Sequence, residues 1–135
     1  MQTPSPRLRI LCLVLAASAG FGPRLAAAAV TPLVWDANGR FEVGFAIEPG
    51  KFVELCGALA AGSRVAWSFT APAALSFNIH YHVGKEVRFP VQRDGVAELD
   101  GTLVAAEPQD YCWMWTHKAG APTSLKVRLE RLAPR

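Results

Sequence analysis

The feature that most constrains the fold is the regular spacing of short segments in which apolar and polar residues alternate. Successive side chains of a β-strand point to opposite faces, so this alternation predicts strands with one buried face. Turn-forming residues, among them Pro49-Gly50 and Gly84, separate the segments at intervals of about 8–12 residues. The expected strands cover residues 41–48, 51–59, 64–70, 75–83, 86–92, 96–106, 111–116 and 125–132.

This pattern predicts an all-β fold made of one domain. Strands at this spacing are typical of a single antiparallel β-sandwich or jelly-roll-like domain, here of about eight strands. We expect Pro72 in a turn between two strands, and Asp100-Gly101 in a hairpin turn or a bulge. Pro90 has no backbone N–H to donate, which places its strand at the edge of a sheet.

The N-terminus has the three parts of a secretory signal. Arg7 and Arg9 precede an apolar run at residues 10–19, and small residues follow at 26–29. The run is shorter than the roughly 20 apolar residues that span a bilayer. We therefore expect a cleaved signal peptide at 1–29 and a domain at 30–135, exported to the periplasm or outside the cell without a membrane span. The alternative is a retained membrane anchor.

Cleavage of this segment changes the charge balance. The full chain carries 14 Lys and Arg against 11 Asp and Glu, a net charge of +3. Arg7, Arg9 and Arg24 leave with the signal peptide, so the net charge of the domain is about zero. No cluster of Lys or Arg remains that could neutralise a run of phosphates, and we expect no nucleic-acid partner.

Two cysteines, Cys56 and Cys112, remain in the domain once Cys12 has left with the signal peptide. An even number of cysteines in an exported chain predicts a disulfide, and the alternative is a pair of buried free thiols. The bridge would stabilise the domain by about 4 kcal/mol in the chain-entropy model. Cys56 alternates with the apolar Val53 and Leu55, so we expect the bridge near the periphery and Cys112 pointing outward.

The order of these segments resembles the GOLD (Golgi dynamics) domain, the lumenal β-sandwich of cargo receptors. The resemblance covers roughly residues 41–132. It begins with a strand, a Pro-Gly turn and an early cysteine at 45–56, followed by a glycine before a strand at 62–65. It continues with an acidic residue followed by glycine at 100–103. It ends with an aromatic strand that contains the second cysteine at 111–116 and a closing strand at 125–132. Cys112 lies closer to Tyr111 than the family's pattern has it. The resemblance implies a sandwich fold and non-enzymatic protein binding, but not cargo-receptor function.

A His-x-His pair marks the segment 77–83. Its apolar residues occupy alternate positions, and Asn78, His80 and His82 occupy the others. With the apolar set inward, the two imidazoles share the outer surface about 6.6 Å apart along the strand. Neutral imidazole suits copper, zinc or nickel, so His80, His82, Met114 and His117 form a candidate metal site for copper or zinc. The alternatives are a hydrogen-bonded polar face, another ligand or a pH sensor.

A second unusual segment is the aromatic strand at 111–116. Tyr111, Trp113 and Trp115 share one face, and Cys112 and Met114 share the other. Both sets are apolar, so alternation alone leaves the buried face open. Aromatic side chains dominate burial in small domains, which favours the aromatic set as core. Exposed, Tyr111, Trp113 and Trp115 would be a candidate interaction face.

The sequence contains no recognisable catalytic set. The serines lack a nucleophile-elbow motif, a bridged cysteine is not a nucleophile, and several carboxylates fall in expected turns. We expect a non-enzymatic exported module that recognises a protein or cell-envelope component through a sheet face. The alternative is a periplasmic copper-binding protein that uses His80 and His82, and a hydrolase with an unrecognised site ranks third.

Overall fold

The computed structural model describes residues 29–134, and these contain seven strands and no helix. The expected signal peptide lies outside the described residues, apart from Ala29. No helix in the described part of the chain is therefore long and apolar enough to cross a membrane. The strands are β1 (Ala29–Pro32), β2 (Arg40–Ile47), β3 (Lys51–Leu59), β4 (Arg64–Val83), β5 (Glu86–Val104), β6 (Gln109–His117) and β7 (Thr123–Leu132).

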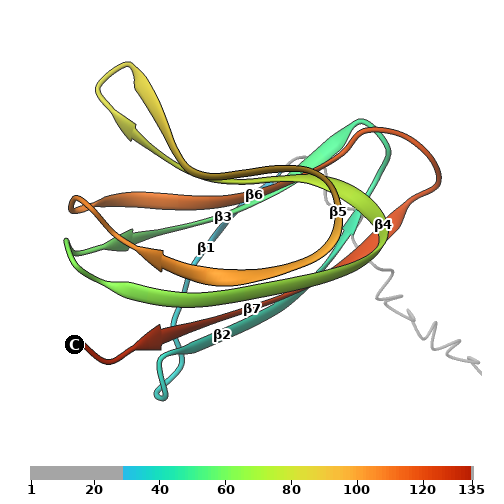
Figure 1. Ribbon diagram of the computed structural model, residues 1–135. Helices are drawn as coiled ribbons and strands as arrows, with labels where there is room; N and C mark the ends of the chain where they lie inside the picture. Colours follow the sequence, from blue (N-terminus) through green and yellow to red (C-terminus); the bar gives the residue numbers. More distant parts are fainter. Residues whose placement is uncertain (1–28, 135) are drawn as a thin grey trace, which may run out of the picture.

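The strands form one hydrogen-bonded sheet in the order β1-β3-β6-β4-β7-β2, with β5 beside β4 (Figure 1). All pairs are antiparallel except β1 with β3. The second half of β4 pairs with β6, and its first half pairs with β7. Because β4 and β5 curve between these halves, the sheet curls over onto itself and encloses a core.

The curvature of β4 and β5 corrects the expected strand boundaries. The segments 64–70 and 75–83 are one strand, as are 86–92 and 96–104, and β1 is additional. Pro72 therefore lies inside β4 rather than in a turn. It falls where the register with β5 shifts between Thr70 and Leu75, a position that needs no ladder hydrogen bond. Asp100-Gly101 likewise lies inside β5, opposite Ser68 and Trp67, and not in a hairpin turn.

An aromatic cluster joins the two halves of the curled sheet. Phe69, from the first half of β4, lies 4.9 Å from Phe77 of the second half and 5.6 Å from Trp115 of β6, measured between ring centroids. Trp67 lies 5.0 Å from Phe77. Side chains from residues far apart in sequence thus share one core, and the all-β class expected from the alternation is confirmed.

Candidate functional site on the outer sheet face

Three neighbouring strands, β3, β6 and the second half of β4, present one solvent-side surface, here called the outer face. On each strand the buried apolar residues point to the core, so the residues between them point outward. The register places Glu54 and Asn78 opposite Met114. The next row of the outer face consists of Cys56, Cys112 and His80.

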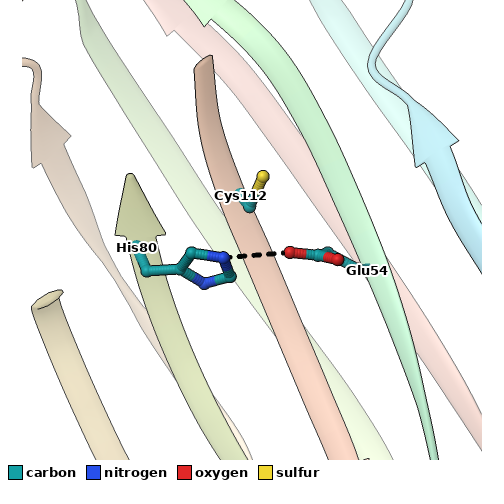
Figure 2. Close-up of side chains that lie close together, drawn as sticks. All are labelled: Glu54, His80 and Cys112. Atoms are coloured by element: carbon teal, nitrogen blue, oxygen red, sulfur yellow. Dashed lines mark ion pairs between the residues drawn. The ribbon is translucent and has the colours of Figure 1, made fainter. Parts of the chain in front are cut away.

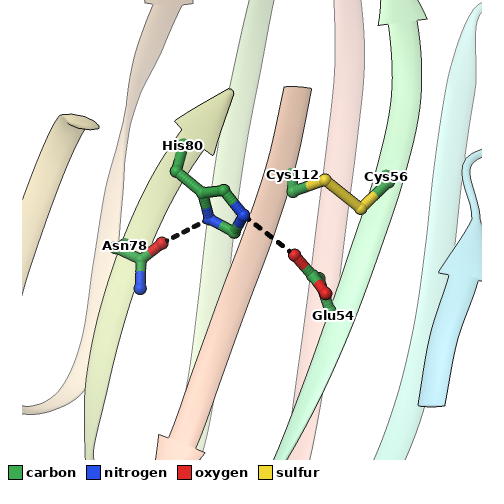
Figure 3. Close-up of a disulfide and its surroundings, with 5 residues drawn as sticks. All are labelled: Glu54, Cys56, Asn78, His80 and Cys112. Atoms are coloured by element: carbon green, nitrogen blue, oxygen red, sulfur yellow. Dashed lines mark hydrogen bonds and ion pairs between the residues drawn. A yellow bond between two sulfur atoms is a disulfide. The ribbon is translucent and has the colours of Figure 1, made fainter. Parts of the chain in front are cut away.

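The expected disulfide is present on this outer face and joins β3 to β6. Cys56 and Cys112 are direct cross-strand partners, with Cα atoms 4.1 Å apart and an S–S bond of 2.09 Å (Figure 3). Cys112 points away from the aromatic core, as alternation predicted for the bridge. Cys112 is buried and Cys56 is half-buried.

A His–Glu pair lies beside the disulfide, with His80 buried and Glu54 half-buried. The Nε2 atom of His80 lies 3.0 Å from Oε1 of Glu54, and its Nδ1 atom lies 2.8 Å from Oδ1 of Asn78 (Figures 2 and 3). The side chains of His80 and Glu54 are only 9% and 14% exposed. Both nitrogens of the imidazole therefore have partners within the protein, which fixes the orientation of the ring.

A bulge in β5 explains why an outward-pointing histidine is buried. Ile79 pairs with Val91 and Tyr81 with Arg88, so two residues of β5 stand opposite the single residue His80. One of these two residues is Phe89, whose ring centroid lies 5.8 Å from that of His80. The phenyl ring covers the imidazole on one side, and His80 keeps only 7% of its surface exposed.

The environment of His80 disfavours its charged form. Burial lowers the pKa of His80, because an imidazolium ion loses its hydration there. The carboxylate of Glu54 acts in the opposite direction, and the neighbouring His82 adds to the lowering. Of these three causes, burial has the largest effect on the pKa of His80.

The four residues of the predicted metal site do not come together. The rings of His80 and His82 lie 5.5 Å apart between centroids, and His82 is exposed. Met114 lies on the outer face, one row from His80. His117 is buried at the far end of β6, with its Nε2 atom 2.8 Å from the backbone oxygen of Ala121. His117 therefore cannot share a metal with His80, and the metal site expected from the sequence is incomplete.

The candidate interaction face on the aromatic strand is also corrected. Tyr111, Trp113 and Trp115 are 0%, 0% and 1% exposed and lie in the core. Of the two faces that the sequence left open, the aromatic one is the buried one. The reason is the curled sheet: the inner side of β6 faces Phe69 and other core residues, and only large side chains fill that space.

Exposed apolar side chains lie instead on the hairpin that joins β4 to β5. This hairpin projects from the other strands (Figure 1, yellow). Val87 and Phe89 share its outer side and are 42% and 45% exposed. On its other side, Nη1 of Arg88 lies 2.9 Å from Oε1 of Glu107, and this ion pair ties the hairpin to the loop before β6.

Sequence reasoning did not identify Glu54 or Phe89 as site residues. Glu54 could have been found, because it alternates with Leu55 and lies two residues before the bridged Cys56. Phe89 was harder to find, because its position over His80 depends on a bulge within the β4–β5 hairpin. Pro90, the other residue of the bulge, is a local signal of an edge strand or a bulge, but it does not say that His80 stands opposite.

The chain was also compared with known proteins. No family model and no curated protein matches it, so the resemblance to GOLD domains stays a prediction. Among solved structures, the fold is similar to two periplasmic inhibitors of g-type lysozyme. PliG of Aeromonas hydrophila is 12% identical, with 77% of this chain and 98% of the inhibitor covered and a TM-score of 0.53. PliG of Salmonella Typhimurium is 11% identical, with 78% and 100% covered and a TM-score of 0.59.

A third similar structure is the pre-peptidase C-terminal domain of a collagenase from Bacillus anthracis. It is 8% identical, with 76% of this chain and 97% of that domain covered and a TM-score of 0.55. At such identities the likeness shows the fold alone. The chain therefore has a β-fold similar to those of these three solved structures.

Proposed function

We propose that this chain is an exported, non-enzymatic module that binds another protein. The observation that carries the proposal is the projecting β4–β5 hairpin, whose outer side exposes Val87 and Phe89. Large apolar side chains that stay exposed next to one another are typical of interaction sites. The export signal expected at residues 1–29 and the resemblance to GOLD domains support the same class of function.

The hairpin is presented for contact in a fixed position. Arg88 pairs with Glu107 at 2.9 Å, and Oη of Tyr81 donates a hydrogen bond of 3.3 Å to the same carboxylate. The bulge directs Phe89 toward the outer face, next to His80. A partner therefore meets an apolar contact that is ordered before binding, which reduces the entropy lost on association.

The first candidate partner is a g-type lysozyme, because two of the similar structures are inhibitors of this enzyme. The test uses the oxidised domain, residues 30–135, and follows the lysis of a cell-wall suspension by a g-type lysozyme. We expect slower lysis with the domain present, and calorimetry should detect a complex. The double variant Val87→Ser/Phe89→Ser should weaken that complex at least about tenfold, as the loss of an aromatic anchor does.

A matched control is Val104→Ser, because Val104 is 57% exposed at the other end of β5. It removes an exposed valine without touching the hairpin and should bind as the unmodified domain does. Equal losses in both variants would show that the hairpin is not the contact. If no lysozyme is bound or inhibited, this class of partner is wrong, and the exported-module proposal has to be tested on other cell-envelope proteins.

A further inference from the structure

The outer face brings metal-ligating atoms of three side chain types together. In residues 29–134, the ligand atoms of Glu54, His80 and Cys112 all lie within 4.8 Å of one another (Figure 2). The sulfur of Cys56 is bonded to that of Cys112 but lies outside this group. In the oxidised protein neither sulfur is a thiolate, so the strongest potential ligands are blocked.

We propose that reduction of the Cys56–Cys112 disulfide creates a zinc site from the two thiolates, the Nε2 atom of His80 and the carboxylate of Glu54. Two sulfurs, one imidazole nitrogen and one carboxylate oxygen are the ligand types that Zn²⁺ takes in proteins. Thiolate ligands select zinc or copper(I) over calcium, magnesium and manganese. The site differs from the His80/His82 pair expected from the sequence, because His82 is not among its ligands.

The fold holds the four ligands on adjacent strands. Cys56 and Glu54 lie on β3, Cys112 on β6 and His80 on β4, and the register keeps all four on the outer face. With Zn–S bonds of about 2.3 Å, two sulfurs in a tetrahedral site lie about 3.8 Å apart. Once the S–S bond is broken, the Cys56 side chain has to turn about its Cα–Cβ bond to bring its sulfur into the group formed by Glu54, His80 and Cys112.

The imidazole of His80 already has the orientation of a zinc ligand. Its Nδ1 atom is held by Asn78 at 2.8 Å, and its Nε2 atom points toward Glu54 beside Cys112. Histidines that bind zinc through one nitrogen usually have the other nitrogen hydrogen-bonded in this way. Asn78 is therefore a positioning residue of the proposed site.

The chemistry balances with a dithiol as the reductant. The dithiol gives two electrons and two protons to the disulfide, so that it becomes a disulfide itself and Cys56 and Cys112 become thiols. Binding of Zn²⁺ then releases the two thiol protons to solvent.

The experiment compares the oxidised and reduced domain in equilibrium dialysis against Zn²⁺, with Co²⁺ as the spectroscopic probe of thiolate ligation. We expect one zinc per reduced chain, a sulfur-to-cobalt charge-transfer band, and at least about tenfold weaker binding to the oxidised domain. Asn78→Ala should weaken zinc binding about 10- to 100-fold, as loss of such a partner does. His80→Ala should weaken it further, and His82→Ala is the matched control that should leave it unchanged.

Three results would overturn the proposal. The reduced domain could bind no more zinc than the oxidised one, the charge-transfer band could be absent, or His82→Ala could weaken binding as much as His80→Ala. Should reduction alone unfold the chain, zinc must restore the near-UV circular dichroism of the core tryptophans in the unmodified domain but not in His80→Ala. A reduced chain that stays unfolded in zinc contradicts the proposal equally.

Discussion

Nε2 of His80 lies 3.0 Å from Oε1 of Glu54, although β4 and β3 do not pair with each other. Both strands pair with β6, and the contact between the two side chains passes over that strand beside Cys112 (Figure 2). The side chains therefore link three strands on the outer face, in addition to the backbone hydrogen bonds beneath them. This link depends on the protonation state of one imidazole, and the stability of the fold should depend on it as well.

The pKa of His80 lies below the ordinary value of 6.5, chiefly because of burial. Glu54 opposes this effect and His82 reinforces it. The unfolded chain therefore binds a proton at His80 more readily than the folded chain does. The contribution of His80 to stability is complete above the unfolded pKa of 6.5 and declines as the pH falls from there toward the lower folded pKa. Urea unfolding of the oxidised domain between about pH 5 and 7.5 should show this decline.

The comparison that isolates His80 uses two glutamine variants. His80→Gln should flatten the dependence of unfolding free energy on pH below about 6.5, because it removes the buried titrating group. His82→Gln changes an exposed imidazole and should keep most of the slope. Equal slopes in the unmodified domain and in His80→Gln would contradict the assignment.

Removal of the disulfide should destabilise the domain. The bridge closes a loop with a sequence separation of 56 residues, and loss of a native disulfide from a small exported domain typically costs about 2–5 kcal/mol. The variant Cys56→Ala/Cys112→Ala should lower the free energy of unfolding by that amount in the presence of a metal chelator. A loss of unfolding free energy below about 0.5 kcal/mol would contradict this prediction and show that the bridge adds little stability to the sheet.

The fold class could be predicted from the sequence because alternation is a local property. The strand at 51–59, for example, alternates Val53 and Leu55 with outward residues, and the structure has it with the same ends. The joining of 64–70 and 75–83 into β4 could not be predicted. Pro72 signals a break, and only pairing with distant strands on both edges makes the chain continue as a strand.

The candidate site could also be predicted in part, because the alternation that places its residues is a local property. Alternation placed His80 on the outer side of its strand, and the even number of cysteines predicted the disulfide. That His80 and Glu54 meet over β6 depends on which strands flank β6, and this is a long-range property of the sheet. Burial of His80 under Phe89 depends in turn on the bulge in β5. Pro90 within this bulge indicates an edge or a bulge, but the pairing with β4 decides which residue stands opposite.

Gly101 should be sensitive to the addition of a single methyl group. A Cβ atom at Gly101 would lie 2.6 Å from Cζ2 of Trp67, whose ring occupies the space above this position in β5. Because Trp67 is 6% exposed and packed against Phe77, it cannot move away freely. Gly101→Ala should therefore destabilise the domain by about 1–3 kcal/mol in urea unfolding, the usual cost of overpacking.

Gly44→Ala is the matched control for this substitution. Gly44 also lies within a strand, β2, but its Cβ would meet only the backbone oxygen of Leu125 at 3.8 Å, an ordinary contact. We expect a change in unfolding free energy within about 0.5 kcal/mol. If both variants lost the same stability, the loss would come from glycine removal in strands and not from the contact with Trp67.

Truncation of the buried Trp115 in β6 should lower the stability of the domain, whereas truncation of the exposed Phe89 in the hairpin should mainly weaken the binding of a partner. Trp115 is 1% exposed and contacts Phe69 and Phe77, so Trp115→Ala leaves a cavity in the core and should cost about 3–5 kcal/mol. Phe89 is 45% exposed, and Phe89→Ala should cost about 1 kcal/mol or less while weakening the binding of a protein partner. Urea unfolding and calorimetry with the partner separate the two effects. If Trp115→Ala kept the stability of the domain and Phe89→Ala kept its binding, both the buried aromatic core and the hairpin contact would be refuted together.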